Sequence, residues 1–314
     1  MFGPDQYARM KDGVILVNAA RGGIFDEKSL ADFLAAGKIG AVGIDVHESE
    51  PCTDSPLREF DNAILTPHIA ASTQEAQLRA GVQTAEYVAA GLEGSIVPTA
   101  LNMAPVPPEV MDAVGPYVPA CQMMGSMLAQ IDGEIPQFLK LTTAGALAHA
   151  DASILVAGTL KGILSYQSTA TVTPVNADAV AKRHGIKVET LSSPDAGGYA
   201  STVSVVADGT EVACTLAGEA QAARLVSLFG YQLDIAPAGQ SLVFEYVDAP
   251  GRVGTIGTIL GEAGINITTM QIATLPGEQC ALVYMNVEGD VDDDVLSKLR
   301  AGLGDLKNLW YVKL

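Results

Sequence analysis

The fold of the first part of this chain is set by the stretch Val14-Ile15-Leu16-Val17-Asn18-Ala19-Ala20-Arg21-Gly22-Gly23. Its first four residues form a short apolar run, and a polar turn with two glycines follows. Similar apolar runs occur at residues 41–44 and 64–65, and residues 26–36 read as a capped amphipathic helix. Short apolar strands that alternate with helices predict a parallel sheet covered on both faces. The predicted fold class is therefore α/β.

Two further polar stretches follow the later apolar runs, at residues 45–51 and 67–73. Ligands of parallel α/β sheets bind beyond the carboxyl ends of the strands, so we expect the three stretches to share one site. Arg21 offers a charged fork that binds a carboxylate bidentately. His68 can transfer a proton near neutral pH, and Glu50 can orient its imidazole. These groups suit hydride transfer between a cofactor and a 2-keto acid.

The composition excludes several classes of partner. The 314 residues carry a net charge of −18 and are 48% hydrophobic, which is typical of a globular chain and unfavourable for nucleic acid or anionic membranes. The longest apolar stretch, 154–164, contains Lys161 and is too short to span a membrane. No secretory signal is recognisable, so we expect a cytoplasmic protein. The four cysteines and four histidines lack metal-site spacing, and no metal is predicted.

The remaining chain divides at prolines. Residues 72–92 predict one long helix, and the domain boundary is placed at a proline-rich linker that contains Pro98, Pro105, Pro107 and Pro108. Residues 107–238 predict an α+β domain, with one helix over 110–130 and a hairpin at Asp208-Gly209. Residues 239–314 predict the βαββαβ order of a ferredoxin-like domain.

The three polar stretches resemble the signature of the NAD-dependent D-2-hydroxyacid dehydrogenases. The order of the later units resembles the long, phosphoglycerate-oxidising branch of that family, which has an intervening regulatory domain and a C-terminal ACT domain. This resemblance implies that residues 1–71 are the C-terminal part of a doubly wound, Rossmann-like NAD-binding domain. Residues 72–106 would be a long helix and linker returning to the substrate domain, residues 107–238 the intervening domain, and residues 239–314 the ACT domain.

The resemblance also implies individual roles. Arg21 would bind the substrate carboxylate, His68 would be the acid/base, and Glu50 its partner. The residues lining the cofactor would be Ala19, Ala20, Arg21, Asp45, His68, Ile69, Ala70 and Ala71, with Asp45 contacting the nicotinamide carboxamide. The family usually has glycine at the position of Ala70, so here the backbone would approach the cofactor less closely.

In the C-terminal unit, Asp248-Ala249-Pro250-Gly251 and Gly264-Ile265-Asn266-Ile267 are similar to ACT-domain amino-acid sites. Tyr246, Asp248 and Asn266 would then bind serine as an effector. The implied activity is oxidation of D-3-phosphoglycerate with NAD, the first step of L-serine biosynthesis, inhibited by serine. ACT units often pair edge to edge, so a homo-oligomer is expected by resemblance.

Two other functions stay open at the level of sequence. The glycine fingerprint, ribose-binding acid and first part of the substrate domain of the family have no counterpart here, so we expect an N-terminally shortened chain that is inactive alone, with one sheet face exposed. One alternative is a catalytically inactive, serine-sensing protein. The other is a dehydrogenase for another D-2-hydroxy acid, because Arg21, Glu50 and His68 do not select the substrate.

Overall fold

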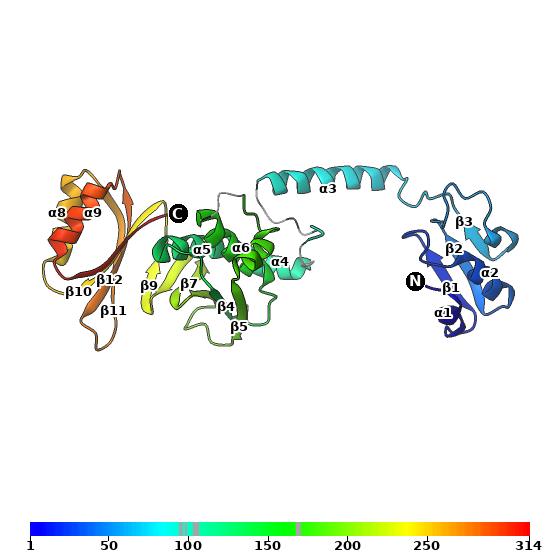
Figure 1. Cartoon of the computed structure of the whole chain (residues 1–314), viewed down its shortest axis with the longest axis horizontal. Helices are drawn as coiled ribbons and strands as arrows, with labels where there is room; N and C mark the ends of the chain where they lie inside the picture. Colours follow the sequence, from blue (N-terminus) through cyan, green and yellow to red (C-terminus); the bar gives the residue numbers. More distant parts are fainter. Residues whose placement is uncertain (94–96, 98, 103–106, 168–170) are drawn as a thin grey trace. The chain divides into compact units, whose positions relative to one another are not determined.

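The computed structural model describes residues 1–93, 97, 99–102, 107–167 and 171–314 of the chain. The chain divides into two compact units, Met1–Ala89 and Ala90–Leu314 (Figure 1). Pro98 and Pro105 of the predicted linker lie outside the described residues. Within the described part, no helix combines the length and the apolar character that crossing a membrane requires.

The first unit contains a parallel three-stranded sheet with strand order β1-β2-β3. Its elements are α1 (Pro4–Ala8), β1 (Val14–Asn18), α2 (Glu27–Ala35), β2 (Ile39–Ile44), η1 (Pro56–Glu59) and β3 (Ala63–Leu65), followed by α3 (Gln74–Leu92), which crosses the boundary between the units. Asp26 caps α2, because its carboxylate accepts a hydrogen bond from the Ser29 backbone N–H. The predicted strands and helices of this unit are confirmed within a few residues.

Within the described part of the chain, one face of this sheet is covered and the other is not. Tyr7 of α1, Leu30 and Leu34 of α2, and Ile39 and Val42 of β2 form a core on that face. On the other side, Ile15, Val17 and Ile64 keep about 70% of their surface exposed. The expectation of a sheet covered on both faces is therefore wrong for the described residues, whereas the expected exposed apolar face is confirmed.

The second unit begins with a helical layer on a six-stranded mixed sheet of order β5-β4-β6-β7-β8-β9. Its helices are α4 (Pro108–Val114), η2 (Gly115–Tyr117), α5 (Val118–Asp132), α6 (Ser153–Gln167) and α7 (Ala177–His184). Its strands are β4 (Phe138–Gly145), β5 (Lys187–Ser193), β6 (Ser201–Ala207), β7 (Thr210–Ala217), β8 (Ala222–Leu228) and β9 (Tyr231–Ile235). Asp208 and Gly209 form the predicted hairpin turn with positive φ angles.

The single helix predicted over residues 110–130 is wrong. The chain leaves the α-helix at Val114, makes a short 3-10 turn and restarts at Val118. Pro116 explains the break, because it lacks the N–H that an α-helix needs at that position and its ring crowds the preceding turn.

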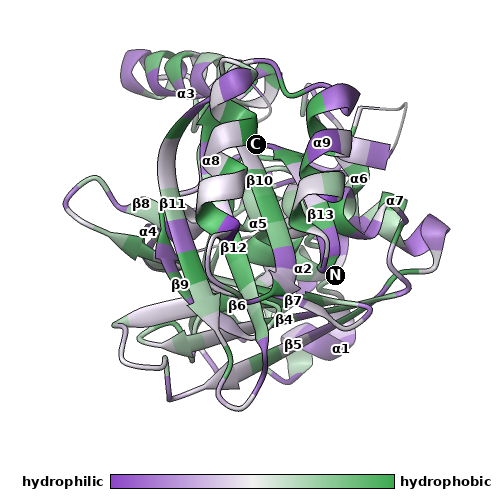
Figure 2. Cartoon of the chain, turned by 90° about the vertical axis from the view of Figure 1, so that its left-hand side faces the viewer, coloured by the Kyte–Doolittle hydropathy of each residue, from purple (hydrophilic) through white to green (hydrophobic). Residues whose placement is uncertain are grey.

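The last part of this unit folds as βαββαβ, as predicted. It consists of β10 (Gln240–Val247), α8 (Arg252–Glu262), β11 (Asn266–Thr274), β12 (Cys280–Glu288), α9 (Asp293–Leu303) and β13 (Leu306–Lys313). The antiparallel sheet has the order β11-β12-β10-β13. In Figure 2, β10 and β12 are mostly green, and β11 carries purple segments. The central strands are therefore the apolar ones.

Both faces of this sheet are covered. Phe244 and Val283 pack with α8 and α9, whereas Leu282 and Tyr284 join the core of the preceding α+β region. Gln130 of α5 also clamps the backbone of Lys313, donating to its carbonyl and accepting from its N–H, each at 2.8 Å. The two predicted C-terminal domains therefore share a core on one face of this sheet, and α8 and α9 cover a separate core on the other face.

Candidate active site

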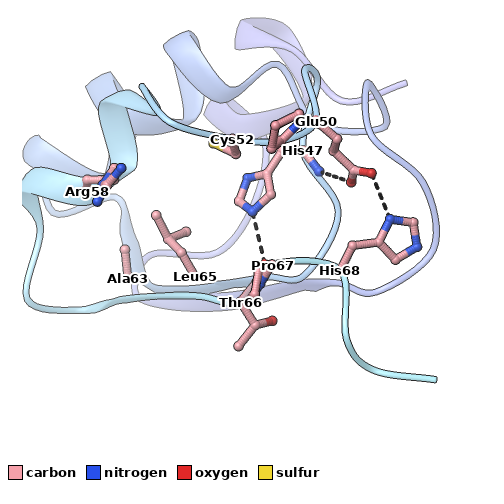
Figure 3. A pocket seen from close by; sticks show the side chains of 10 residues that line it. His47, Glu50, Cys52, Arg58, Ala63, Leu65, Thr66, Pro67 and His68 are labelled. Atoms are coloured by element: carbon pink, nitrogen blue, oxygen red, sulfur yellow. Dashed lines mark hydrogen bonds and ion pairs between the residues drawn. The ribbon is translucent and has the colours of Figure 1, made fainter. Parts of the chain in front are cut away.

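Two of the three predicted catalytic side chains are in direct contact. Glu50 lies on the loop after β2, and His68 lies on the turn after β3. His68 Nδ1 and Glu50 Oε2 are 2.8 Å apart (Figure 3). An ionised carboxylate can only accept, so Nδ1 carries the proton and donates it. The Nε2 atom of a neutral His68 is then left with a lone pair that can accept a proton.

The electrostatics agree with an ionised Glu50. The hydrogen bond from His68 lowers the pKa of Glu50 below its usual range, and the His47 backbone N–H adds to this effect. A negative Glu50 stabilises a protonated His68 ring. The Nε2 atom of His68 can therefore accept a proton, and the Glu50 carboxylate balances the positive charge of the ring that forms.

Asp45 holds the turn that carries His68. Its Oδ1 accepts from the Thr66 hydroxyl and from the Ile69 N–H, and its Oδ2 accepts from the Ala70 N–H. The Thr66 hydroxyl is the main cause of a lowered Asp45 pKa, followed by the Ile69 N–H. His68 adopts a left-handed φ of 55°, which side chains rarely adopt. The buried Asp45 carboxylate secures this conformation.

Arg21 lies on the turn after β1, at the same edge of the sheet. The buried Asn18 side chain shapes this turn, because it accepts from the Ala20 N–H and donates to the Arg21 carbonyl. The exposed Arg21 guanidinium bonds to the Ala20 carbonyl and, among the described residues, forms no ion pair. It is free to bind an anion.

The Arg21 turn packs tightly on the Glu50 loop. A Cβ atom at Gly22 would lie 1.9 Å from the His47 carbonyl oxygen, so only glycine permits this approach. Among the described residues, no hydrogen bond or ion pair joins Arg21 to His68 or Glu50, so the structure brings the loops together and leaves the guanidinium apart from the pair.

A cavity of about 500 Å³ adjoins the His68–Glu50 pair (Figure 3). It is lined by His47, Glu50, Pro51, Cys52, Arg58, Ala63, Leu65, Thr66, Pro67 and His68. Its size is in the range of small-molecule sites.

The residues predicted to line a nicotinamide are available to a ligand. Ala19, Ala20, Arg21 and the run from His68 to Ala71 are exposed, and Asp45 is buried beside them. Asp45 Oδ2 accepts one hydrogen bond, so it retains a lone pair that can accept from an amide N–H. This acceptor fits the N–H group of a carboxamide.

The three residues predicted to bind serine do not meet within one chain. Tyr246 pairs with Ala281 at the start of β12, and Asp248 follows Tyr246 just beyond β10. Asn266 pairs with Glu288 at the other end of β12. Ala281 and Glu288 are seven residues apart, which is about 23 Å along a strand. One serine molecule cannot reach both ends.

Sequence reasoning missed several residues that shape the site: Asn18, Glu27, His47 and Thr66. Asn18, Glu27 and His47 are buried. A polar side chain directly after an apolar run is the signal that could have singled out Asn18 and Thr66. The contacts of Glu27 and His47 depend on neighbouring loops and leave no local pattern.

Comparisons with known proteins place two segments of the chain. Residues 1–70 match the family model "D-isomer specific 2-hydroxyacid dehydrogenase, NAD binding domain", and residues 113–229 match "D-3-phosphoglycerate dehydrogenase intervening domain". The D-3-phosphoglycerate dehydrogenase of Mycobacterium leprae is 38% identical over 94% of this chain. That of Methanocaldococcus jannaschii is 34% identical over 100% of this chain.

These relatives are longer than the chain, which spans 57% of the Mycobacterium leprae protein and 60% of the Methanocaldococcus jannaschii protein. The chain resembles both along nearly its whole length. The predicted resemblance to D-2-hydroxyacid dehydrogenases, with an NAD-binding segment followed by an intervening domain, is confirmed.

Proposed function

We propose that this chain carries the acid/base half-site and the regulatory part of an NAD-dependent D-3-phosphoglycerate dehydrogenase, which catalyses the first step of L-serine biosynthesis. The hydrogen-bonded Glu50–His68 pair carries this proposal. It lies within the segment that matches an NAD-binding domain, and the intervening-domain match further along the chain favours phosphoglycerate over another D-2-hydroxy acid. A cytoplasmic location belongs to the same proposal.

The proposed mechanism assigns one task to each side chain. Arg21 binds the substrate carboxylate through its guanidinium. His68 Nε2 takes the proton of the C2 hydroxyl, and Glu50 stabilises the imidazolium that forms. Ala19, Ala20, Asp45 and the run from His68 to Ala71 hold the nicotinamide. NAD, when bound, supplies the hydride acceptor.

A transplant tests this proposal on the residues that carry it. The segment of the Mycobacterium leprae enzyme that aligns with residues 14–71 is replaced by the segment from this chain, and NADH formation from D-3-phosphoglycerate is followed. We expect turnover, and we expect His68→Ala to lower kcat by about 10²–10⁴-fold, the usual contribution of an acid/base group.

The parent enzyme in the same assay is the control. A folded transplant without turnover, or a His68→Ala variant as fast as the unmodified transplant, would refute the acid/base assignment. The second result would favour a segment that has no catalytic role.

Regulation by serine is the second part of the proposal. Tyr246 and Asp248 lie at one end of the β11-β12-β10-β13 sheet and Asn266 at the other. We therefore infer that a serine site takes Tyr246 and Asp248 from one copy of the chain and Asn266 from a second copy. A two-fold symmetric pair forms two such sites.

Titration calorimetry with serine separates the possibilities. Asp248→Ala and Asn266→Ala should each abolish binding. An equimolar mixture, after exchange of copies, should regain about one quarter of the wild-type sites, because half of the pairs are mixed and each mixed pair has one intact site. No binding by the wild type, or no recovery on mixing, would contradict the shared serine site.

A further inference from the structure

His47 is a buried imidazole at the centre of the loops that carry Glu50 and His68. It lies after β2 and is only 6% exposed. The ring Nε2 lies 3.1 Å from the Thr66 carbonyl oxygen, and the ring Nδ1 lies 3.6 Å from Glu27 Oε1 (Figure 3 shows the Thr66 contact). One side chain thus reaches the end of β3 and the start of α2.

The chemistry of the partners fixes the direction of the first contact. A carbonyl oxygen only accepts, so Nε2 carries a proton and donates it to Thr66. In the neutral ring, Nδ1 then has a lone pair, and it makes no hydrogen bond to any residue that the structure describes. The directional bond of the ring is therefore the one to Thr66, two residues before His68.

The backbone of the same residue holds Glu50. The His47 N–H donates to Glu50 Oε1 at 3.0 Å, while Glu50 Oε2 accepts from His68 at 2.8 Å. His47 therefore touches both sides of the catalytic pair, with its backbone on the Glu50 side and its ring on the His68 side.

Glu27 of α2 holds the loop after β2 at two further points, Glu48 and Ser55. The Glu27 carboxylate accepts from the Glu48 N–H at 3.0 Å and from the Ser55 hydroxyl at 2.8 Å, and the Glu48 side chain accepts from the Glu27 N–H at 3.1 Å. These bonds hold the loop against α2 without reaching the end of β3. The ring of His47 adds a link to that strand, beside the bonds that Asp45 accepts from Thr66, Ile69 and Ala70.

We propose that His47 is a positioning residue, whose Nε2–H bond to the Thr66 carbonyl sets the spacing between Glu50 and His68. Asp45 keeps the His68 turn at the end of β2, so loss of the His47 bond lets the Glu50 loop shift against that turn and lengthens the Glu50–His68 hydrogen bond. The inference rests on the proposed function for the role of His68, but the geometry of the pair can be measured without turnover.

The test follows the Glu50 carboxyl carbon by ¹³C NMR during an acid titration of the full chain. The wild-type Glu50 pKa lies below its usual range because of the His68 and His47 bonds. In His47→Phe, which retains a ring of similar volume and has no donor, we expect the Glu50 pKa to rise toward its ordinary value. In His47→Gln, whose amide N–H can replace Nε2, we expect a titration close to the wild type.

One control and one substitute variant distinguish loss of the Thr66 bond from a general loosening of the loop. Ser55→Ala removes one bond to Glu27 without touching Thr66, so the Glu50 titration should stay as in the wild type. His47→Leu is prepared in parallel in case the phenylalanine variant does not fold. A wild-type titration in a folded His47→Phe or His47→Leu variant would overturn the proposal, as would equal displacement in His47→Gln and His47→Phe.

Discussion

The two sheets formed by the β1-β2-β3 strands and the β11-β12-β10-β13 strands use apolar residues in opposite ways. In β1, residues alternate between exposed and partly buried positions, and Ile15 and Val17 face outward with 69% of their surface exposed. In β12, every residue from Cys280 to Val287 is buried, because one face packs on helices and the other on the neighbouring core. The parallel sheet presents its polar residues at its strand ends, whereas the antiparallel sheet packs between two layers of apolar side chains.

The carboxylates of the candidate site differ from two groups buried in the second unit. Asp45 and Glu50 of the first unit are held as carboxylates by hydrogen bonds that lower their pKa values. Burial in the second unit favours neutral groups, raising the pKa of Tyr284 and of Cys121 to about 12. Hydrogen bonds therefore favour the charged forms of Asp45 and Glu50, whereas burial favours the neutral forms of Tyr284 and Cys121, as it does for Tyr7 in the core of the first unit.

The largest expected effect comes from truncating one residue in each sheet. Leu282 of β12 is fully buried, so Leu282→Ala should lower the unfolding free energy of the second unit by about 3 kcal/mol through lost burial and a residual cavity. Ile15→Ala removes an exposed side chain and should change the stability of the first unit by less than about 0.5 kcal/mol. Denaturant unfolding measures both. Equal losses would contradict the difference in coverage.

A smaller effect is expected from the buried hydroxyl of Tyr284, which donates to the Ser241 hydroxyl. Tyr284→Phe should cost about 1 kcal/mol at neutral pH, the usual net value of one hydrogen bond. Because the folded pKa is raised to about 12, the stabilisation is complete below the ordinary tyrosine value and is lost as the pH rises through 12.

Alkaline unfolding monitored by circular dichroism tests this sign. The variant should lose less stability than the wild type between about pH 10 and 12. The same pH dependence in both proteins would mean that Tyr284 titrates normally.

Acidification should lower the stability of the first unit. The lowered pKa values of Asp45 and Glu50 stabilise the first unit above the ordinary carboxyl pKa, and this contribution is lost as the pH falls through the lowered folded values. Thr66→Val removes the main cause of the Asp45 shift, so its first unit should lose less stability on acidification. Hydrogen exchange of the β1–β3 amides against pH measures the loss. An acid response as large as that of the wild type would contradict the role of Thr66.

Much of this architecture could be predicted from local patterns. The apolar runs predicted the parallel strands, Asp26 predicted the start of α2, and Asp208-Gly209 predicted the hairpin. The break at Pro116 was missed because the apolar residues on both sides continue a helical pattern. The apolar pattern therefore predicted one continuous helix, whereas in the structure Pro116 interrupts it.

Local patterns in the sequence predicted the candidate site only in part. The Glu50–His68 contact was predicted because both residues lie in polar stretches that follow neighbouring parallel strands, and because the family resemblance pairs a glutamate with the histidine. The bonds of His47 to Thr66 and of Asp45 to Ile69 join residues on different loops, so no spacing along the chain reveals them. Likewise, the separation of Asp248 from Asn266 follows from strand register, which the sequence does not display.

Titration of the Glu50 carboxyl by ¹³C NMR, in the wild-type chain and in His68→Gln, measures whether Glu50 is the ionised partner of His68. We expect a wild-type Glu50 pKa below its usual range, and a higher value in the variant because the main hydrogen bond is weakened. A wild-type Glu50 that titrates at its ordinary pKa, or a pKa that is the same in both proteins, would contradict it.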